Sequence, residues 1–201
     1  IILALQAVDY VLINMPSSSF NDENKLLSMF DNLLTACDIA EPKKIIFNTS
    51  MYVADGDVQF QAPGVRREMI NRLQQSQHSN VTVKPVIYMD NLLSAWARPG
   101  ITERKVFCYP HNDKLDVSWI CLRDVANIML ALTEKNEFDG QEIPIGGPEA
   151  LKGDDIARHL SKSLGLNVEF QSMPILEFGK IMADLFADSN SFDAKKYPMN
   201  W

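Results

Sequence analysis

Short apolar runs alternate with amphipathic stretches along this chain, and that order restricts the folds that it can adopt. Residues 8–13 (VDYVLI) and 44–48 (KIIFN) are mostly apolar and end abruptly in polar residues, as buried parallel strands do. Residues 22–39 and 65–75 carry apolar side chains at the i, i+3, i+4, i+7 spacing of an amphipathic helix. This alternation predicts an α/β fold in which helices cover both faces of a parallel sheet.

The rest of the chain continues the pattern with shorter segments. Strands are expected at residues 81–83, 105–109, 116–121, 141–145 and 167–171. Helices are expected at residues 91–96, 123–134, 154–164 and from Pro174 onward. Gly165 should end the helix over 154–164. We expect the C-terminal third to form a smaller α+β subdomain.

Composition argues against several classes of protein. The chain has 201 residues, of which 46% are hydrophobic and 22% charged, as in an ordinary globular protein. Its net charge of -7 argues against nucleic acid as a partner, because neutralising phosphates requires clustered Lys and Arg. No apolar run approaches the ~20 residues of a membrane span. Three widely spaced cysteines favour reduced thiols in a cytoplasmic protein.

Short motifs for several common chemistries are missing from the sequence. It contains no GxSxG, Walker loop, HExxH or GxGxxG. We expect His78, His111 and His159 to be solvent-exposed, and we expect no metal site. Gly146 and Gly147 follow a predicted strand, but the adjoining Pro and Glu suit a turn better than a phosphate-binding loop.

Three predicted strands end in polar or aromatic residues: at 14–17, at 48–52 and at 85–91. In an open parallel sheet, ligands bind outside the carboxyl ends of the strands. A binding site is therefore expected where these three segments meet.

Five segments carry a resemblance to a known family: VDYVLINMP, KKIIFNTS, VTVKPVIYMDNLL, WICLRDVANIMLAL and GQEIPIGGPEALKGDDIARHLSKSLG. In this order and spacing they resemble the NmrA-like branch of the atypical short-chain dehydrogenase/reductases, from about residue 3 to about residue 182. The resemblance implies a Rossmann-like domain over residues 1–135 that binds NAD(P)(H). It also implies a substrate or partner subdomain over residues 136–201, interleaved with residues 105–120.

Matched to the family, the chain begins in the helix before the fourth strand of the Rossmann domain. Residues 1–7 (IILALQA) fit the last turns of that helix and include no initiator Met. The family's first three strands and glycine loop, roughly 70–80 residues by the size of βα units, would then precede residue 1. We therefore expect the sheet of this chain to be incomplete at its N-terminal side.

The resemblance also implies which residues hold the cofactor. The end of the fourth family strand lines the ribose and nicotinamide, the fifth carries a serine that orients the reacting carbonyl, and the sixth meets the carboxamide. The residues of this chain at those places are Asn14, Met15, Pro16, Ser17, Thr49, Ser50, Tyr52, Pro85, Val86, Ile87, Tyr88 and Asn91. Each of them could instead be an ordinary loop or cap residue, and Tyr52 a packed aromatic.

One departure from the family concerns catalysis. The Tyr-xxx-Lys pair of the superfamily falls on Phe60 and Gly64, which carry neither a phenolic proton nor a charge. Arg66 could replace the charge in part but cannot act as a base. The only phenol near these positions is Tyr52.

Three hypotheses remain open from the sequence. The first is an NAD(P)H-dependent oxidoreductase for a small carbonyl or quinone-like substrate, with NADP slightly favoured over NAD. The second is a non-catalytic sensor that binds NAD(P) and a protein partner, and the third is a fold that binds no nucleotide. Pocket walls for the first would come from Trp96, Phe107, Trp119 and Met182, although core packing explains each equally well. The oligomeric state stays open.

Overall fold

The computed structural model describes residues 1–16, 22–56 and 61–185, with the side chains of residue 61 and of residues 182–185 left out. The chain divides into two compact units. The first contains Ile1–Pro85 and Arg123–Ile145, and the second contains Val86–Leu122 and the chain from Gly146 onward. The functional division expected from the sequence, into residues 1–135 and residues 136–201 interleaved with 105–120, stays a prediction.

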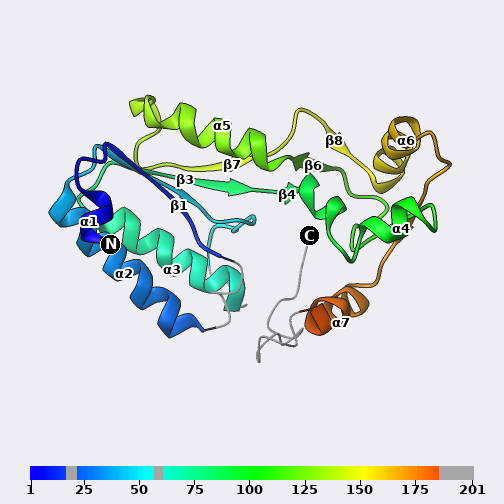
Figure 1. Ribbon diagram of the computed structural model, residues 1–201, viewed down its shortest axis with the longest axis horizontal. Coiled ribbons are helices and arrows are strands. Elements are labelled where there is room, and N and C mark those ends of the chain that lie inside the picture. The colour runs from blue at the N-terminus through cyan, green and yellow to red at the C-terminus, as the bar shows by residue number, and fades with distance from the viewer. Residues whose placement is uncertain (17–21, 57–60, 186–201) are drawn as a thin grey trace. The chain divides into compact units, whose positions relative to one another are not determined.

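A parallel sheet of four strands forms the centre of the first unit. Its order is β1 (Tyr10–Asn14), β2 (Lys44–Asn48), β3 (Asn80–Pro85) and β7 (Glu142–Ile145). Helices α2 (Glu23–Ala40) and α3 (Gln61–Gln75) lie on one face and α5 (Leu122–Thr133) lies on the other (Figure 1). The predicted parallel sheet with helices on both faces is confirmed.

Local sequence signals explain most of the boundaries in this unit. Asp22 caps α2 by accepting a hydrogen bond from the Lys25 amide at 3.0 Å. Helix α1 (Ile2–Leu5) agrees with the helical interpretation of residues 1–7. Helix α3 begins at Gln61, four residues before the predicted start, since Pro63 fits a first helical turn.

The face of the sheet toward α2 and α3 is packed with apolar side chains. Phe30 and Phe47 are fully buried, and their ring centroids lie 5.4 Å apart. Ile45 and Met69 belong to the same core cluster. β1 lies at the edge of the sheet, where the Leu12 side chain is 49% exposed.

The opposite face carries a buried lysine. Lys44 on β2 is 2% exposed, and its ammonium group lies 2.7 Å from the Asp139 carboxylate and 3.0 Å from Asn136 Oδ1. Asn136 belongs to a 3-10 turn, η3 (Asn136–Phe138), which follows α5. The sheet strand and the segment after α5 are thereby joined by a charged pair.

Replacing Asp139 by Asn should make the protein less stable near neutral pH, and the loss should shrink in acid. Burial raises the pKa of Asp139, but hydrogen bonds from Lys44 and Ser79 outweigh that effect and lower it overall. A carboxyl group whose pKa is lower in the folded state stabilises the fold at pH values above its unfolded-state pKa of about 4. This contribution is lost as the pH falls through the folded-state pKa. Because a third of the Asp139 side chain is exposed, we expect the substitution to lower the free energy of unfolding by only about 1 kcal/mol.

Urea unfolding of the wild type and Asp139→Asn at pH 7 and pH 3 would check this. The matched control is Asp9→Asn, since the Asp9 carboxylate pairs with Lys43 at the surface, where both side chains are mostly exposed. If Asp139→Asn lowers the free energy of unfolding by the same amount at both pH values, the stabilisation does not come from the ionised Asp139 carboxylate.

The second unit is built from short strands. β4 (Ile87–Tyr88), β6 (Val117–Ile120) and β8 (Ala150–Leu151) form one sheet in the order β4-β6-β8. β5 (Val106–Tyr109) and β9 (Glu169–Ser172) form a parallel pair. The helices are η2 (Met89–Leu93), α4 (Arg98–Thr102), α6 (Gly153–Leu164) and α7 (Ile175–Leu185).

Agreement with the expected elements is mixed in this unit. The predicted end of α6 is confirmed, because Gly165 follows it with a φ of 65°. β4, β8 and α4 were not predicted, since elements of two to five residues are too short to show a hydrophobic period.

Two histidines differ from the expectation of solvent exposure. The His78 side chain is 10% exposed, and its Nε2 lies 2.9 Å from Asp38 Oδ1. His111 is 4% exposed, and its Nε2 lies 2.7 Å from the Leu115 carbonyl oxygen. The ring packs beside Trp119 and Phe170, so the loop after β5 is folded onto the aromatic core. Among the described residues, no group of three His, Cys, Asp or Glu side chains could hold a metal ion. No helix in the same ranges is long and apolar enough to cross a membrane.

Candidate functional site

Two asparagines and a serine meet at the carboxyl ends of β1 and β2. Asn14 and Asn48 are register partners in the two strands, and Asn48 Nδ2 donates to Asn14 Oδ1 at 2.8 Å. The Ser50 hydroxyl donates to the same oxygen at 3.2 Å, and the Ser50 amide donates to Asn48 Oδ1 at 2.9 Å. We call Asn14, Asn48 and Ser50 the asparagine cluster.

Ser50 has an unusual backbone within this cluster. Its φ of 61° lies in the left-handed region, which costs a non-glycine residue about 1–2 kcal/mol. The hydrogen bond from its amide to Asn48 helps to hold that conformation. Strained conformations of this kind gather at ligand sites. Ala7 and Glu41 of the first unit share the left-handed backbone, but of the three only Ser50 follows the carboxyl end of a strand.

Thr49, which was predicted to bind cofactor with Ser50, lies differently. It is fully buried, and its hydroxyl lies 2.6 Å from the Met51 carbonyl oxygen and 3.1 Å from that of Val83. Arg66, itself 6% exposed, donates from Nε to the Thr49 carbonyl oxygen at 2.6 Å. Thr49 therefore anchors the chain after β2, whereas Ser50 is partly exposed.

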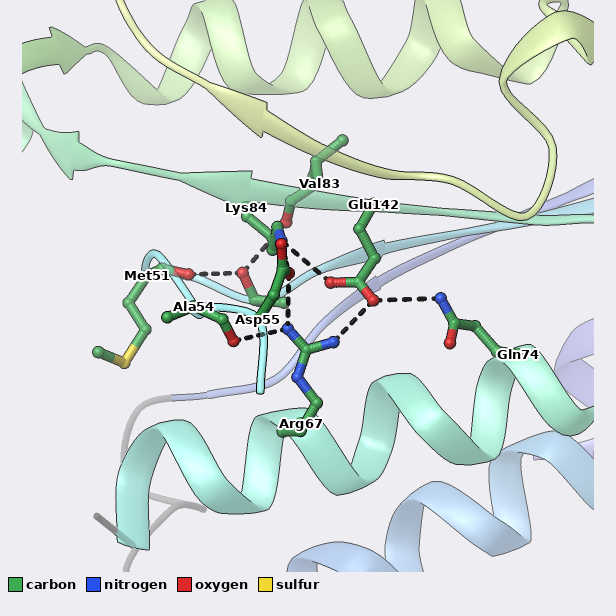
Figure 2. Close-up of polar contacts among 9 residues, drawn as sticks. Met51, Ala54, Asp55, Arg67, Gln74, Val83, Lys84 and Glu142 are labelled. Atoms are coloured by element: carbon green, nitrogen blue, oxygen red, sulfur yellow. Dashed lines mark hydrogen bonds and ion pairs between the residues drawn. The ribbon is translucent and has the colours of Figure 1, made fainter. Parts of the chain in front are cut away.

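A charged network holds the loop that follows, between the sheet and α3 (Figure 2). The Lys84 ammonium group on β3 lies 3.1 Å from Asp55 and 3.0 Å from Glu142, and only 4% of the Lys84 side chain is exposed. Arg67 on α3 donates to Glu142 at 2.6 Å and to the Ala54 carbonyl oxygen at 2.8 Å. The loop end at residues 54–55 is thereby attached to β3 and α3.

The pKa values of the two carboxyl groups reflect this network. Hydrogen bonding and the charge of Lys84 lower the pKa of Asp55. Burial raises the pKa of Glu142, but hydrogen bonds from Arg67 and Lys84 outweigh it and lower the pKa overall. Both groups are ionised at neutral pH, so the network combines two cations with two carboxylates.

Tyr52 projects from the same loop. Its side chain is 43% exposed, and the Lys84 ammonium group lies 5.7 Å from the centre of its ring. A cation at this distance from an aromatic face is attracted to it. Tyr52 is therefore not buried in the core, and its ring contacts Lys84.

The predicted residues of the sixth family strand lie partly in the first unit and partly in the second. Pro85 ends β3 in the first unit, while Val86, Ile87, Tyr88 and Asn91 belong to the second. Ile87 is 8% exposed and pairs with Trp119 in the register of β4 and β6.

Asn91 lies inside η2 and reaches into the aromatic core of the second unit. Its Nδ2 donates to the Tyr109 hydroxyl at 3.1 Å. Burial raises the pKa of Tyr109 to about 12, against a smaller lowering by this hydrogen bond. Of the expected pocket walls, Phe107 and Trp119 are buried in the core, whereas Trp96 is partly exposed.

The remaining predicted positions lie at the end of β1, in α3 or outside the described residues. Ser17 and Phe60 fall outside the described residues, as does the side chain of Met182. Gly64 lies in the first turn of α3. Met15 is partly exposed and packs against the core of the first unit, and Pro16 is exposed.

Sequence reasoning placed Asn48 in a segment of the expected site but did not name it among the cofactor residues, and it missed the charged network. A signal for Asn48 was present, because both strands end in the same way, Ile13–Asn14 and Phe47–Asn48. Nothing local marks Lys84, whose partner Glu142 is 58 residues away along the chain. The pairing exists only because β3 and β7 are neighbours.

Comparison with solved structures identifies the fold. A nucleoside-diphosphate-sugar epimerase of Staphylococcus aureus superimposes with a TM-score of 0.73 at 18% identity, over 98% of this chain and 68% of that one. An NADPH-dependent quinone oxidoreductase of Escherichia coli, complexed with NADPH, also gives 0.73, at 20% identity over 97% of this chain and 69% of that one. This chain has a Rossmann-like fold.

Among curated proteins, the chain is similar to an NAD(P)H azoreductase of Xenophilus azovorans. The identity is 30% over 166 residues, which are 81% of this chain. The match spans 55% of the azoreductase, or little more than half of its length. No family model matches the sequence.

Proposed function

We propose that the whole protein is an NmrA-like NAD(P)H-dependent oxidoreductase for a small carbonyl, quinone or azo substrate. Its similarity to an azoreductase, and its fold likeness to a reductase complexed with NADPH, support a nicotinamide nucleotide as the cofactor, with NADP favoured. When bound, that cofactor would supply a hydride. The observation that carries the proposal is the asparagine cluster with its strained Ser50.

The cluster fits the ribose and nicotinamide side of such a cofactor. Asn14 is exposed, and its Nδ2 has no hydrogen-bond partner among residues 1–16, 22–56 and 61–185. Its Oδ1 is occupied by Asn48 and Ser50, which fixes the side-chain amide with Nδ2 outward. An oriented, unused donor at the carboxyl edge of a parallel sheet suits a ribose hydroxyl or a carboxamide oxygen.

Titrating the whole protein with NADPH and NADH by calorimetry tests this proposal. Asn14→Ala should weaken NADPH binding about tenfold, because one hydrogen bond and the fixed position of Ser50 are lost together. Asn32→Ala on the exposed surface of α2 is the matched control and should bind as the wild type does. Failure of the wild type to bind either nucleotide would refute the proposal.

The second candidate is a non-catalytic NAD(P) sensor with a protein partner. The specific observation in its favour is Gly64, which offers no side chain on α3 where the superfamily keeps its lysine. A sensor would bind NADPH without oxidising it in the presence of a panel of quinones and azo compounds. It would also bind its protein partner with different affinity in the presence of NADP+ and of NADPH. Capture of the partner in the presence of each nucleotide would measure this difference.

A further inference from the structure

A reductive reaction of the proposed kind requires a proton as well as a hydride, and the usual tyrosine position is Phe60. The inference below rests on the proposed function and asks which group supplies that proton. At the carboxyl edge of the first unit's sheet, the described proton-bearing side chains are few. Thr49 is fully buried, and Ser50 donates its single hydroxyl proton to Asn14.

Tyr52 is the remaining hydroxyl at this edge in the described part of the chain. It lies two residues after Ser50, and its side chain is 43% exposed. Its phenol oxygen makes no hydrogen bond to any described residue, while its ring is held from one face by Lys84. The ring is thus bound by its face and the hydroxyl is left available.

The loop that carries Tyr52 is fixed on both sides of it. On one side, the Thr49 hydroxyl contacts the Met51 carbonyl oxygen at 2.6 Å. On the other, Arg67 donates to Ala54 at 2.8 Å and Lys84 to Asp55 at 3.1 Å (Figure 2). A group held by such supporting contacts loses little entropy when it meets a substrate, which is a requirement for efficient proton transfer.

We propose that Tyr52 is the proton donor of the reduction and that Lys84 positions its ring. A bound nicotinamide nucleotide would supply the hydride and be oxidised in doing so, and the Tyr52 hydroxyl would supply the proton. The phenolic O–H bond breaks as an O–H or N–H bond forms on the substrate. The Tyr52 phenolate then takes a proton from water, to which its exposed side chain has access.

The test is Tyr52→Phe in the whole protein, which keeps the ring over Lys84 and removes only the hydroxyl. We expect kcat for a quinone or azo dye to fall by about 100-fold, with KM and the Kd for NADPH unchanged. Tyr10→Phe is the matched control, because the Tyr10 hydroxyl contacts Glu134 at the amino end of β1. Its kcat should equal that of the wild type.

A second measurement does not depend on turnover. With 3-fluorotyrosine incorporated, the fluorine resonance that disappears in Tyr52→Phe is assigned to Tyr52. Adding a non-reducible substrate analogue to the NADP+ complex should shift this resonance and leave that of Tyr10 in place. A shift confined to other tyrosines would overturn the assignment.

The outcomes separate this inference from the proposed function. Wild-type turnover with an unchanged kcat in Tyr52→Phe overturns the role of Tyr52 and leaves the oxidoreductase intact. NADPH binding without turnover of any acceptor also overturns it, in favour of the sensor. A protein that binds no nicotinamide nucleotide refutes the proposed function, and the proton donor with it. If activity is lost in Tyr52→Leu but kept in Tyr52→Phe, the aromatic ring is required for packing and the hydroxyl is not the proton donor.

Discussion

Replacing Lys84 by Met should lower the free energy of unfolding by about 3 kcal/mol. The lysine is 4% exposed and lies between the carboxylates of Asp55 and Glu142. Removing it leaves Glu142, whose side chain is 16% exposed, with Arg67 as its remaining cation. The cost arises because a buried carboxylate that loses a partner regains neither water nor an equivalent hydrogen bond.

Urea unfolding at pH 7 would measure the loss, and Lys43→Met is the matched control. Lys43 also pairs with an aspartate, Asp9, at 3.1 Å, but both side chains of this pair are mostly exposed to water. Because solvent screens such a pair, the control should change stability little. Equal losses in the two variants would contradict the view that Lys84 is a buried structural charge.

Replacing Gly147 by Ala should be the most damaging small substitution in the second unit, costing about 3 kcal/mol. A Cβ at this position would lie 2.0 Å from the Trp119 carbonyl oxygen and 3.1 Å from the carbon of the same group. Both atoms belong to the backbone of β6, so no side-chain rotation relieves the clash. The strand itself would have to move away from the chain at Gly147.

Gly140→Ala is the control that separates crowding from backbone strain. Gly140 has a φ of 75° and no atom within 4 Å of an added Cβ, so only the left-handed backbone is penalised, by about 1 kcal/mol. Thermal unfolding followed by far-ultraviolet dichroism would report both variants, and the near-ultraviolet signal of Trp119, which is buried in the second unit, would report Gly147→Ala. A loss in Gly147→Ala no larger than that in Gly140→Ala would contradict the close approach.

Periodicity and abrupt polar endings were sufficient to predict the central architecture. β2 was predicted to the residue, because an apolar run with an abrupt polar end marks it. α2 was predicted to within one residue at each end, because its helical period extends over 18 residues. The prediction was weaker in the second unit, where β4 and β8 each have two residues. Their positions depend on pairing with β6, which no local signal reports.

The candidate site shows a similar limit. The ends of β1 and β2 were recognisable as polar, and the structure brings Asn14 and Ser50 together there. Their role as cofactor ligands stays a prediction. The sequence could not indicate that Thr49 turns inward or that Lys84 lies beneath Tyr52, since both depend on contacts between separate strands. Likewise, the burial of His111 follows from packing against rings from β6 and β9.

The interleaving of the two units has a consequence for synthesis on the ribosome. The first unit is interrupted between Pro85 and Arg123, and its sheet acquires β7 only at Glu142–Ile145. Domains generally fold as units as the chain emerges, yet here β3 has no outer neighbour until about sixty further residues have been translated. During that interval Lys84 has no Glu142 to pair with. A nascent chain halted before residue 142 should therefore stay protease-sensitive, and one released beyond residue 145 should gain resistance in a single step.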